Sequence, residues 1–412
     1  MSATDPQGLQ AFPAELRDRA AWLEPFDWYQ TMRETEPVRY DPDRQVWDVF
    51  RYDDVKRVLD EDGERFSVDP RTSETYRQPE RPEEELIFET MLFQDPPRHD
   101  VLRGVVEDSF DPRALRDLEP EIRNIASGML DEAVSEARGT IDFVEEIAYP
   151  LPVVVIAEML GIPSEERDRF KRWSDTLVEA TSDDELSDEY LERQRQAQFE
   201  MATYFLQALE ARQETPRDDL LTDLALAVDD DSVVFTQEEA LGTCILLLIA
   251  GNVTTTNLLA NAIRCFAPQN MFDGGSDLSL PLAIEEVARY RSPVQAAITR
   301  VALEEVTLGG KTIEAGDQVI VWLGSANRDG RQFEEPDRFV PDRRPNQHLA
   351  FGHGTHYCLG APLARLEARV AFEELFDRVE RLELAEADLQ PTRSSFVYGV
   401  ESLPVRYERN TA

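Results

Sequence analysis

One cysteine, Cys358, stands where it could do chemistry, at the end of a glycine-punctuated loop. The loop, residues 351–360, has the sequence FGHGTHYCLG, and Pro362 followed by helix formers predicts a helix start directly after it. The loop glycines permit backbone turns through which successive N–H groups can point at the sulfur. Together with the positive end of the helix dipole, these donors favour a thiolate. The pattern therefore predicts a held thiolate, either a nucleophile or a metal ligand.

A second stretch combines a buried helix with residues that disfavour helices. Thr236 and Glu239 form a capping-box pattern, which predicts a helix through the apolar residues 244–250. A helix that is apolar on all sides is a buried one. Residues 251–256, GNVTTT, are poor helix formers. Such a conflict is typical of a functional site, and a plain kinked core helix is the alternative.

The loop sequence matches F-G-x-G-x-H-x-C-x-G at every specified position. It resembles the heme-binding signature of the cytochrome P-450 family of heme-thiolate monooxygenases. The resemblance implies that Cys358 is the axial thiolate ligand of the iron of heme b (iron protoporphyrin IX), in a binding loop that includes Phe351 and Gly352. It also implies that the thiolate helps to cleave the O–O bond of bound dioxygen.

The family resemblance implies a mainly α fold with small β-sheets. In this α+β fold, a triangular helical prism holds the heme between the long central helix and the cysteine-loop helix. We expect one catalytic domain over residues 1–412. Its β-rich part would cover about 30–60 and 297–323, and its helical heme-binding core about 95–290 and 345–382.

The same resemblance implies roles for the central helix. Ala250 and Gly251 would leave room for dioxygen, and Thr254 would be the oxygen-activating threonine. The family usually has an acid directly before that threonine, whereas this chain has Val253. Valine cannot relay protons. Either Asn252, the next threonine and waters substitute for the acid, or the enzyme activates oxygen slowly or works from peroxide.

Two further sets of residues are implied by the resemblance. One set would hold the heme propionates through charge-assisted bonds. Its members are His99, Arg103, Arg300 and His356. The other set would form a structural network that fixes the cysteine loop, although a surface ion pair is the ordinary interpretation of an i,i+3 Glu and Arg. Its members are Glu286, Arg289 and Arg338.

Composition narrows the class of protein. The 412 residues include 83 acidic and 43 basic ones, for a formal net charge of -40, which argues against nucleic acid and anionic membranes as partners. Only three of the basic residues are lysines, a combination typical of a high-salt cytoplasm such as that of a halophilic archaeon. Three cysteines give no disulfide framework, and residues 1–8 show no leader pattern. We expect a soluble, cytoplasmic monomer without a membrane anchor.

The first functional hypothesis is a monooxygenase that inserts one oxygen atom from O₂ into a small hydrophobic organic substrate. Its electrons would come from a ferredoxin-type donor docking near four arginines close to the loop, Arg343, Arg344, Arg365 and Arg369. The substrate pocket beside the heme would be lined by Val294, Ala296, Ala297 and Ile298 and by residues 396–400. The alternatives are a peroxide-driven peroxygenase or isomerase, a heme-based sensor, and a hydrolase with Cys358 as nucleophile and His356 as base.

Local patterns predict several other elements. The pattern of residues 38–50 indicates a β-hairpin, and residues 297–303 resemble a strand. Helices are expected near 53–59, 115–130, 153–160 and 281–290, with two more between 164 and 212 separated by the acidic residues 182–185. Residues 67–95 are expected to be mostly loop.

Overall fold

The computed structural model describes residues 13–410 except 74–75, 77–86, 136–137, 167–168, 171, 174–175, 177–187, 230–233, 273–278, 298–299, 386–387, 393 and 395. The acidic break predicted at 182–185 lies outside these residues, and so do residues 74–75 and 77–86 of the loop predicted at 67–95. So do residues 298 and 299 of the predicted strand. The described parts of that loop and strand are compatible with the prediction, since only short elements occur there.

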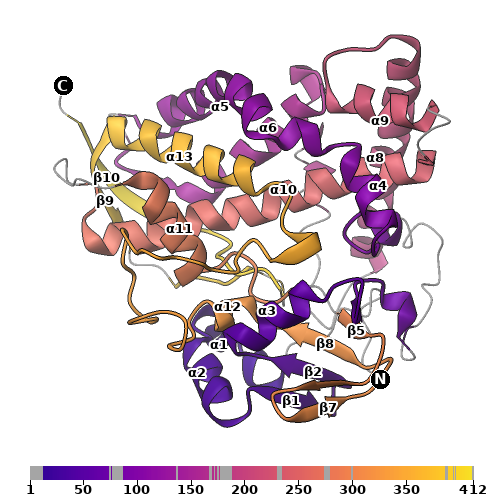
Figure 1. The fold of residues 1–412 in the computed structure, drawn as a ribbon. Helices are drawn as coiled ribbons and strands as arrows, with labels where there is room; N and C mark the ends of the chain where they lie inside the picture. The colour runs from indigo at the N-terminus through magenta and orange to yellow at the C-terminus, as the bar shows by residue number, and fades with distance from the viewer. Residues whose placement is uncertain are drawn as a thin grey trace.

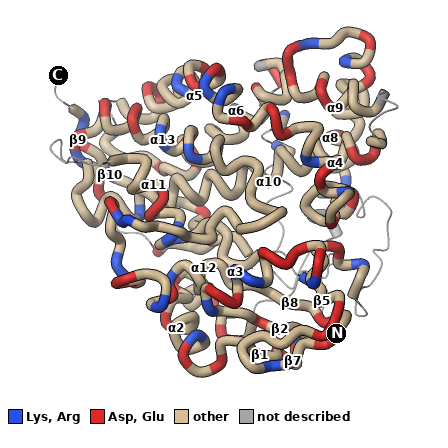
Figure 2. The backbone as a smooth tube through the Cα atoms, in the orientation of Figure 1, with Lys and Arg blue, Asp and Glu red and all other residues tan. Residues whose placement is uncertain are grey.

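The longest helix, α10 (Gln237–Phe266), crosses the middle of the molecule (Figure 1). The predicted capping box is confirmed, because the Thr236 hydroxyl accepts from the Glu239 N–H and the Glu239 carboxylate accepts from the Thr236 N–H. The helix continues unbroken through residues 251–256, since buried packing overrides their weak helix preference. Figure 2 shows α10 almost free of charged residues, as its central position requires.

The protein is mainly helical. Besides α10, its α-helices are α1 (Arg19–Leu23), α2 (Phe26–Thr35), α3 (Tyr52–Asp60), α4 (Arg98–Gly104), α5 (Pro112–Ala133), α6 (Pro150–Met159), α8 (Asp188–Glu214), α9 (Leu220–Asp229), α11 (Leu280–Tyr290), α12 (Leu323–Ala326) and α13 (Ala361–Arg378). Short helical segments are η1 (Ala14–Leu16), η2 (Pro70–Thr72), η4 (Glu107–Phe110), the π-helix η5 (Val144–Ala148), η6 (Ser164–Glu166), η7 (Ala267–Gln269) and η8 (Gly354–His356). The helices predicted near 53–59, 115–130, 153–160 and 281–290 are thus confirmed as α3, α5, α6 and α11.

In the described part of the chain, three small sheets accompany the helices. The five-stranded sheet has the order β1 (Val38–Asp41), β2 (Val46–Val49), β8 (Gln318–Val321), β5 (Arg300–Ala302), β3 (Phe66–Ser67). The others join β4 (Thr140–Asp142), β10 (Pro404–Arg409) and β9 (Val379–Leu384), and β6 (Val306–Leu308) with β7 (Lys311–Ile313). The predicted hairpin is confirmed, since β1 and β2 pair antiparallel, and β2 pairs parallel with β8. Segments almost 300 residues apart in sequence therefore share one sheet.

The main hydrophobic core surrounds α10 and includes faces of α5, α6, α11 and α13. Figure 1 shows α5, α6 and α13 above α10, and the five-stranded sheet with α2 and α3 below it. Within the described part of the chain, Gln237–Gln269 is the one helical span long and apolar enough to cross a membrane, and 67% of its most apolar window is buried inside the protein. This span is the core helix of the fold.

Candidate functional site

The cysteine loop is held tightly between α3 and α13. Gly352 and Gly354 have positive φ angles of 76° and 68°, and a Cβ on Gly354 would lie 2.6 Å from the Leu59 carbonyl oxygen. The Cys358 N–H donates to the Phe351 carbonyl at 2.9 Å, which closes the loop on itself. The predicted helix follows directly as α13, with its proline in the first turn. The loop therefore fixes the cysteine at the start of this helix.

Cys358 is accessible to solvent, but protein atoms surround most of its sulfur. The residue is exposed, whereas Cys244 and Cys265 are buried. Desolvation nevertheless raises the pKa of the Cys358 thiol, against the opposing effect of the Gly360 N–H and of nearby Arg103. The loop donors favour the thiolate, as predicted, but desolvation by the protein atoms around the sulfur outweighs their effect on the pKa. A bound cation supplies the missing positive charge, so the geometry favours a metal ligand over a free nucleophile.

A strip of accessible surface runs along α10 although the helix is otherwise buried. Ala250 is exposed, and Gly251 and Thr254 are partly exposed. A Cβ placed on Gly251 would meet only Ile156, at 3.9 Å. The Thr254 hydroxyl donates to the Ala250 carbonyl at 2.8 Å. The structure thus brings the three predicted residues to one open face, where a small ligand has room.

Asn252 does not belong to this face. Its side chain is fully buried, and its Oδ1 accepts a hydrogen bond from the Thr256 hydroxyl at 3.2 Å. Two residues along a helix correspond to a rotation of about 200°, so Asn252 and Thr254 point in nearly opposite directions. The alternative in which Asn252 and Thr255 substitute for the missing acid is therefore disfavoured, since the Thr255 side chain is buried as well. Val253 is partly exposed and occupies the position of that acid.

The predicted propionate residues gather around His356. The rings of His99 and His356 lie 4.4 Å apart between centroids, in an edge-to-face arrangement. Burial, and then the charges of Arg300, His99 and Arg103, lower the pKa of His356 to about 2. The structure therefore brings together residues separated by up to 257 positions, and it keeps the His356 imidazole neutral.

Three residues of this cluster have contacts that bear on how they would hold a ligand. Arg103 donates from Nη1 to the Tyr357 carbonyl at 2.8 Å, beside the cysteine. Arg300 makes a two-pronged bond to the buried carboxylate of Asp62, a residue that the sequence had not indicated. The Nε2 atom of His356 is buried without a hydrogen-bond partner among the described residues. Such an orphaned polar atom among cations is what an anionic group of a ligand would satisfy.

The structural network that fixes the loop contains a different arginine from the predicted one. Glu286 and Arg289 are fully buried and bonded through both carboxylate oxygens, each at 2.8 Å. The third member is Arg343, whose Nε lies 3.0 Å from each oxygen of Glu286. The Arg338 side chain is 68% exposed and pairs with Glu335 at the surface. The prediction of Arg338 is therefore wrong, although its backbone carbonyl accepts from both buried arginines.

The arginines predicted to attract an electron donor are largely neutralised. Arg343 is buried in the network just described. Arg365 is bonded to Glu285 at 2.6 Å and lies over the Phe351 ring at 4.3 Å, and Arg369 is paired with Glu119 and Glu373. Arg344 remains exposed. Three of the four arginines therefore have acidic partners, which weakens their support for docking of an acidic donor.

The two predicted lining segments lie side by side. Val294 and Val397 form an antiparallel bridge, and the Gln295 N–H donates to the Phe396 carbonyl at 2.7 Å. Asn261 of α10 donates from Nδ2 to the Tyr398 carbonyl at 3.0 Å, so the second segment is anchored to the central helix. Both segments therefore lie close to the helix that carries the open face.

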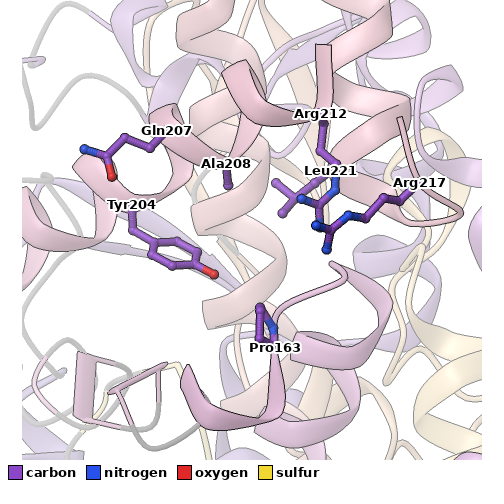
Figure 3. Close-up of a pocket in the computed structure, with 7 residues that line it drawn as sticks. All are labelled: Pro163, Tyr204, Gln207, Ala208, Arg212, Arg217 and Leu221. Carbon is purple, nitrogen blue, oxygen red and sulfur yellow. The ribbon is translucent and has the colours of Figure 1, made fainter. Parts of the chain in front are cut away.

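A separate pocket of about 250 Å³ lies at the outer helices (Figure 3). Its walls come from α8, α9 and the connections before each of them. The lining residues are Pro163, Tyr204, Gln207, Ala208, Arg212, Arg217 and Leu221. None of them belongs to the cysteine loop or the open face of α10, so this pocket is not the site described above.

Three features of the site point to one kind of cofactor. The accessible cysteine at a helix start would bind a metal, and the open face of α10 at Gly251 leaves room for a flat ring system. The cationic cluster with its unpaired histidine nitrogen would bind acidic groups. Heme has all three of these parts. The fold and site therefore define a heme-thiolate protein.

Comparison with known proteins agrees with this class. Residues 279–405 match the family model of Cytochrome P450. The chain is 42% identical over 400 residues to Cytochrome P450 109 from Bacillus spizizenii, covering 95% of this chain and 94% of that protein. Substrate-free CYP109E1 from Bacillus megaterium is 43% identical with a TM-score of 0.85, covering 94% of this chain and 100% of the other. The same enzyme in complex with testosterone has a TM-score of 0.83 and 43% identity, covering 94% and 99%.

The chain belongs to the cytochrome P450 family. It has the predicted mainly helical fold, its cofactor is heme b, and it is an oxidoreductase with heme-thiolate monooxygenase activity. Its cytochrome P450 relatives act on small organic molecules and use redox partners. The hydrolase hypothesis is excluded by this membership.

Proposed function

We propose that the protein hydroxylates a hydrophobic substrate of steroid size, with two electrons from a ferredoxin-type donor. The observation that carries the proposal is the exposed Ala250 in the middle of a buried helix, with Gly251 and Thr254 beside it. Such a strip places an apolar, accessible wall inside the core, next to the apolar segments at residues 294–297 and 396–400. The structure of CYP109E1 with testosterone makes a steroid the first compound to test.

The residues have distinct tasks in this proposal. When bound, heme supplies the activation of dioxygen and the transfer of one oxygen atom to the substrate. Cys358 holds the iron through its sulfur, while His99, Arg103, Arg300 and His356 hold the propionates. The Thr254 hydroxyl holds a proton at Oγ1, in its bond to the Ala250 carbonyl, next to the space left by Gly251.

The proton supply supports a second candidate, a peroxide-driven peroxygenase. Val253 replaces the usual acid, and Asn252 points into the protein rather than to the open face. Peroxide brings its own protons and electrons, so it bypasses the missing relay. A heme-based sensor without turnover has no comparable support, because sensing does not need the open threonine-bearing face.

The remaining properties are part of the same proposal. We propose a single catalytic domain over residues 1–412, acting as a cytoplasmic monomer in a high-salt cell. The sharing of one sheet by residues 38–49 and 300–321 supports one domain, and the net charge of -40 supports the high-salt setting. Of the four arginines near the cysteine loop, Arg344 is the one left to attract the donor by its exposed charge.

The test is turnover of testosterone by the purified holoprotein in molar salt. One reaction contains a ferredoxin, its reductase and NADPH, and the other contains hydrogen peroxide alone. A product 16 mass units heavier in the first reaction supports the monooxygenase, as expected for insertion of one oxygen atom. Product from peroxide alone would favour the peroxygenase. Absence of product and of any substrate-induced shift of the heme spectrum would reject the steroid class.

A further inference from the structure

Asp62 forms a buried ion pair with a residue of the propionate cluster. It follows α3, and its side chain has no exposed surface. Its Oδ1 accepts from Arg300 Nε at 3.1 Å and its Oδ2 from Arg300 Nη2 at 2.8 Å. This two-pronged geometry fixes the plane and direction of the guanidinium. Asp62 therefore determines how Arg300 faces the site.

The Asp62 carboxylate also interacts electrostatically with charged groups of the proposed heme site. Besides Arg300, the charges that act on Asp62 are those of Asp95 and His99. Asp95 is itself bonded to the Ser67 hydroxyl at 2.5 Å and to the Val68 N–H at 3.0 Å, so it does not neutralise Arg300. Arg300 in turn acts on His356, two residues before Cys358. A change of charge at Asp62 is therefore felt close to the iron ligand.

Asp62 changes the charge that Arg300 presents to the site. Its carboxylate has no exposed surface and lies 2.8 Å from Arg300 Nη2, so one negative charge offsets the positive charge of this guanidinium. A propionate bound to the same guanidinium is then compensated less completely. In a buried site such a negative charge is weakly screened, and it favours the more positive oxidation state of a nearby metal.

We propose that Asp62 is a positioning residue that shares Arg300 with a heme propionate and makes the reduction potential of the heme iron more negative. The inference rests on the proposed propionate role of Arg300. A more negative potential makes the iron harder to reduce without substrate. Asp62 would then limit wasteful transfer of electrons from the donor.

The chain contains a matched control for this proposal. Arg212 and Asp219 form a similar two-pronged ion pair, with Nε to Oδ1 at 3.1 Å and Nη2 to Oδ2 at 2.7 Å, and both side chains are also buried. This pair lies between α8 and α9, where Figure 3 shows Arg212 beside the outer pocket. Asp219→Asn therefore removes a buried carboxylate from an arginine without touching the propionate cluster.

The experiment is spectroelectrochemical titration of holoprotein carrying Asp62→Asn, Asp62→Glu or Asp219→Asn. Asp62→Asn should make the midpoint potential more positive, so that at one fixed potential the ratio of reduced to oxidised heme rises at least about threefold. A tenfold rise would correspond to about 59 mV for one electron. Asp62→Glu and Asp219→Asn should both stay at the wild-type potential.

Equal potentials for Asp62→Asn and wild type would overturn the proposal, as would an equal shift in Asp219→Asn. If Asp62→Asn does not retain heme, Asp62→Ser removes the same charge and leaves space for water to bond Arg300. The reduced, carbon-monoxide-bound spectrum of the wild type is recorded first. Lack of heme there would mean that the proposed function has failed, whereas normal heme with an unmoved potential would reject only the role of Asp62.

Discussion

Arg343 lies against Glu286 with its Nε 3.0 Å from both carboxylate oxygens, inside the protein and 57 residues along the chain. Arg289 binds the same carboxylate from the other side. Arg343 also donates to the carbonyls of Glu334 at 2.6 Å and of Arg338 at 3.2 Å. One buried carboxylate thus ties α11 to the long connection that leads to the cysteine loop.

Loss of Arg343 should strongly destabilise the protein. Arg343→Leu leaves the Glu286 carboxylate with one cation, and breaking a buried ion pair costs about 3–5 kcal/mol. Urea unfolding in molar salt, followed by heme absorbance and by circular dichroism, measures this loss. Arg338→Leu is the control and should change stability by less than about 0.5 kcal/mol, because that side chain is exposed. Equal effects of the two variants would contradict the assignment.

The exchange of Arg338 for Arg343 in the buried network could not be predicted from the sequence. The capping box, the hairpin and the main helices follow from local periodicity and turn chemistry, and they are confirmed. Residues 334–345 have no such periodicity, so nothing in the sequence distinguishes the arginine that points inward from the one that points outward. The structure decides this through three carbonyls and one carboxylate that converge on Arg343.

Asn252 and Asp62 are two other residues whose surroundings were not predicted from the sequence. The direction of Asn252 could have been predicted, since helix geometry alone places it opposite Thr254. Asn252 was nevertheless named for the proton relay, because it stands next to Val253 in the sequence. Asp62 could not have been predicted, because its partner Arg300 is 238 residues away and the two meet only through the packing of β3, β5 and α3.

Restoring an acid next to Thr254 should speed turnover with dioxygen. Val253 is partly exposed beside the open face, so Val253→Glu places a carboxyl where protons are needed. General acid catalysis contributes about 10²-fold or more, and we expect ferredoxin-driven product formation to rise by up to about that factor. Product formation per NADPH consumed is the second measure.

Two controls accompany this variant. Val253→Gln has nearly the same shape without an acid, and it should not give the gain. Turnover driven by peroxide should respond little to either change, because it bypasses the relay. If Val253→Glu and Val253→Gln behave alike with dioxygen, the missing acid does not limit the reaction.

Glu367 of α13 should make stability fall as the pH rises. Its carboxylate is buried with no charged partner among the described residues, and burial raises its pKa to about 8 from an ordinary value of 4.5. The folded state therefore binds a proton that the unfolded state releases between these values. The contribution of this group to stability is lost from about pH 4.5 upward and levels off above about pH 8.

Glu367→Gln tests this directly, since glutamine cannot lose the proton. The stability of the variant relative to wild type should increase from pH 5 to pH 9, by an amount on the order of a few kcal/mol. Urea unfolding at pH 5, 7 and 9 in constant salt provides the comparison. A difference that stays constant over this range would show that Glu367 does not titrate as its surroundings indicate.

The central claim is that the Cys358 sulfur binds the heme iron. The direct measurement is the absorption spectrum of the reduced, carbon-monoxide-bound protein in high salt, for wild type and for Cys358→Ser. The account predicts a strongly red-shifted Soret band in the wild type and its loss in the variant. A variant that keeps this band, or a wild type that contains heme but never shows it, would contradict the account.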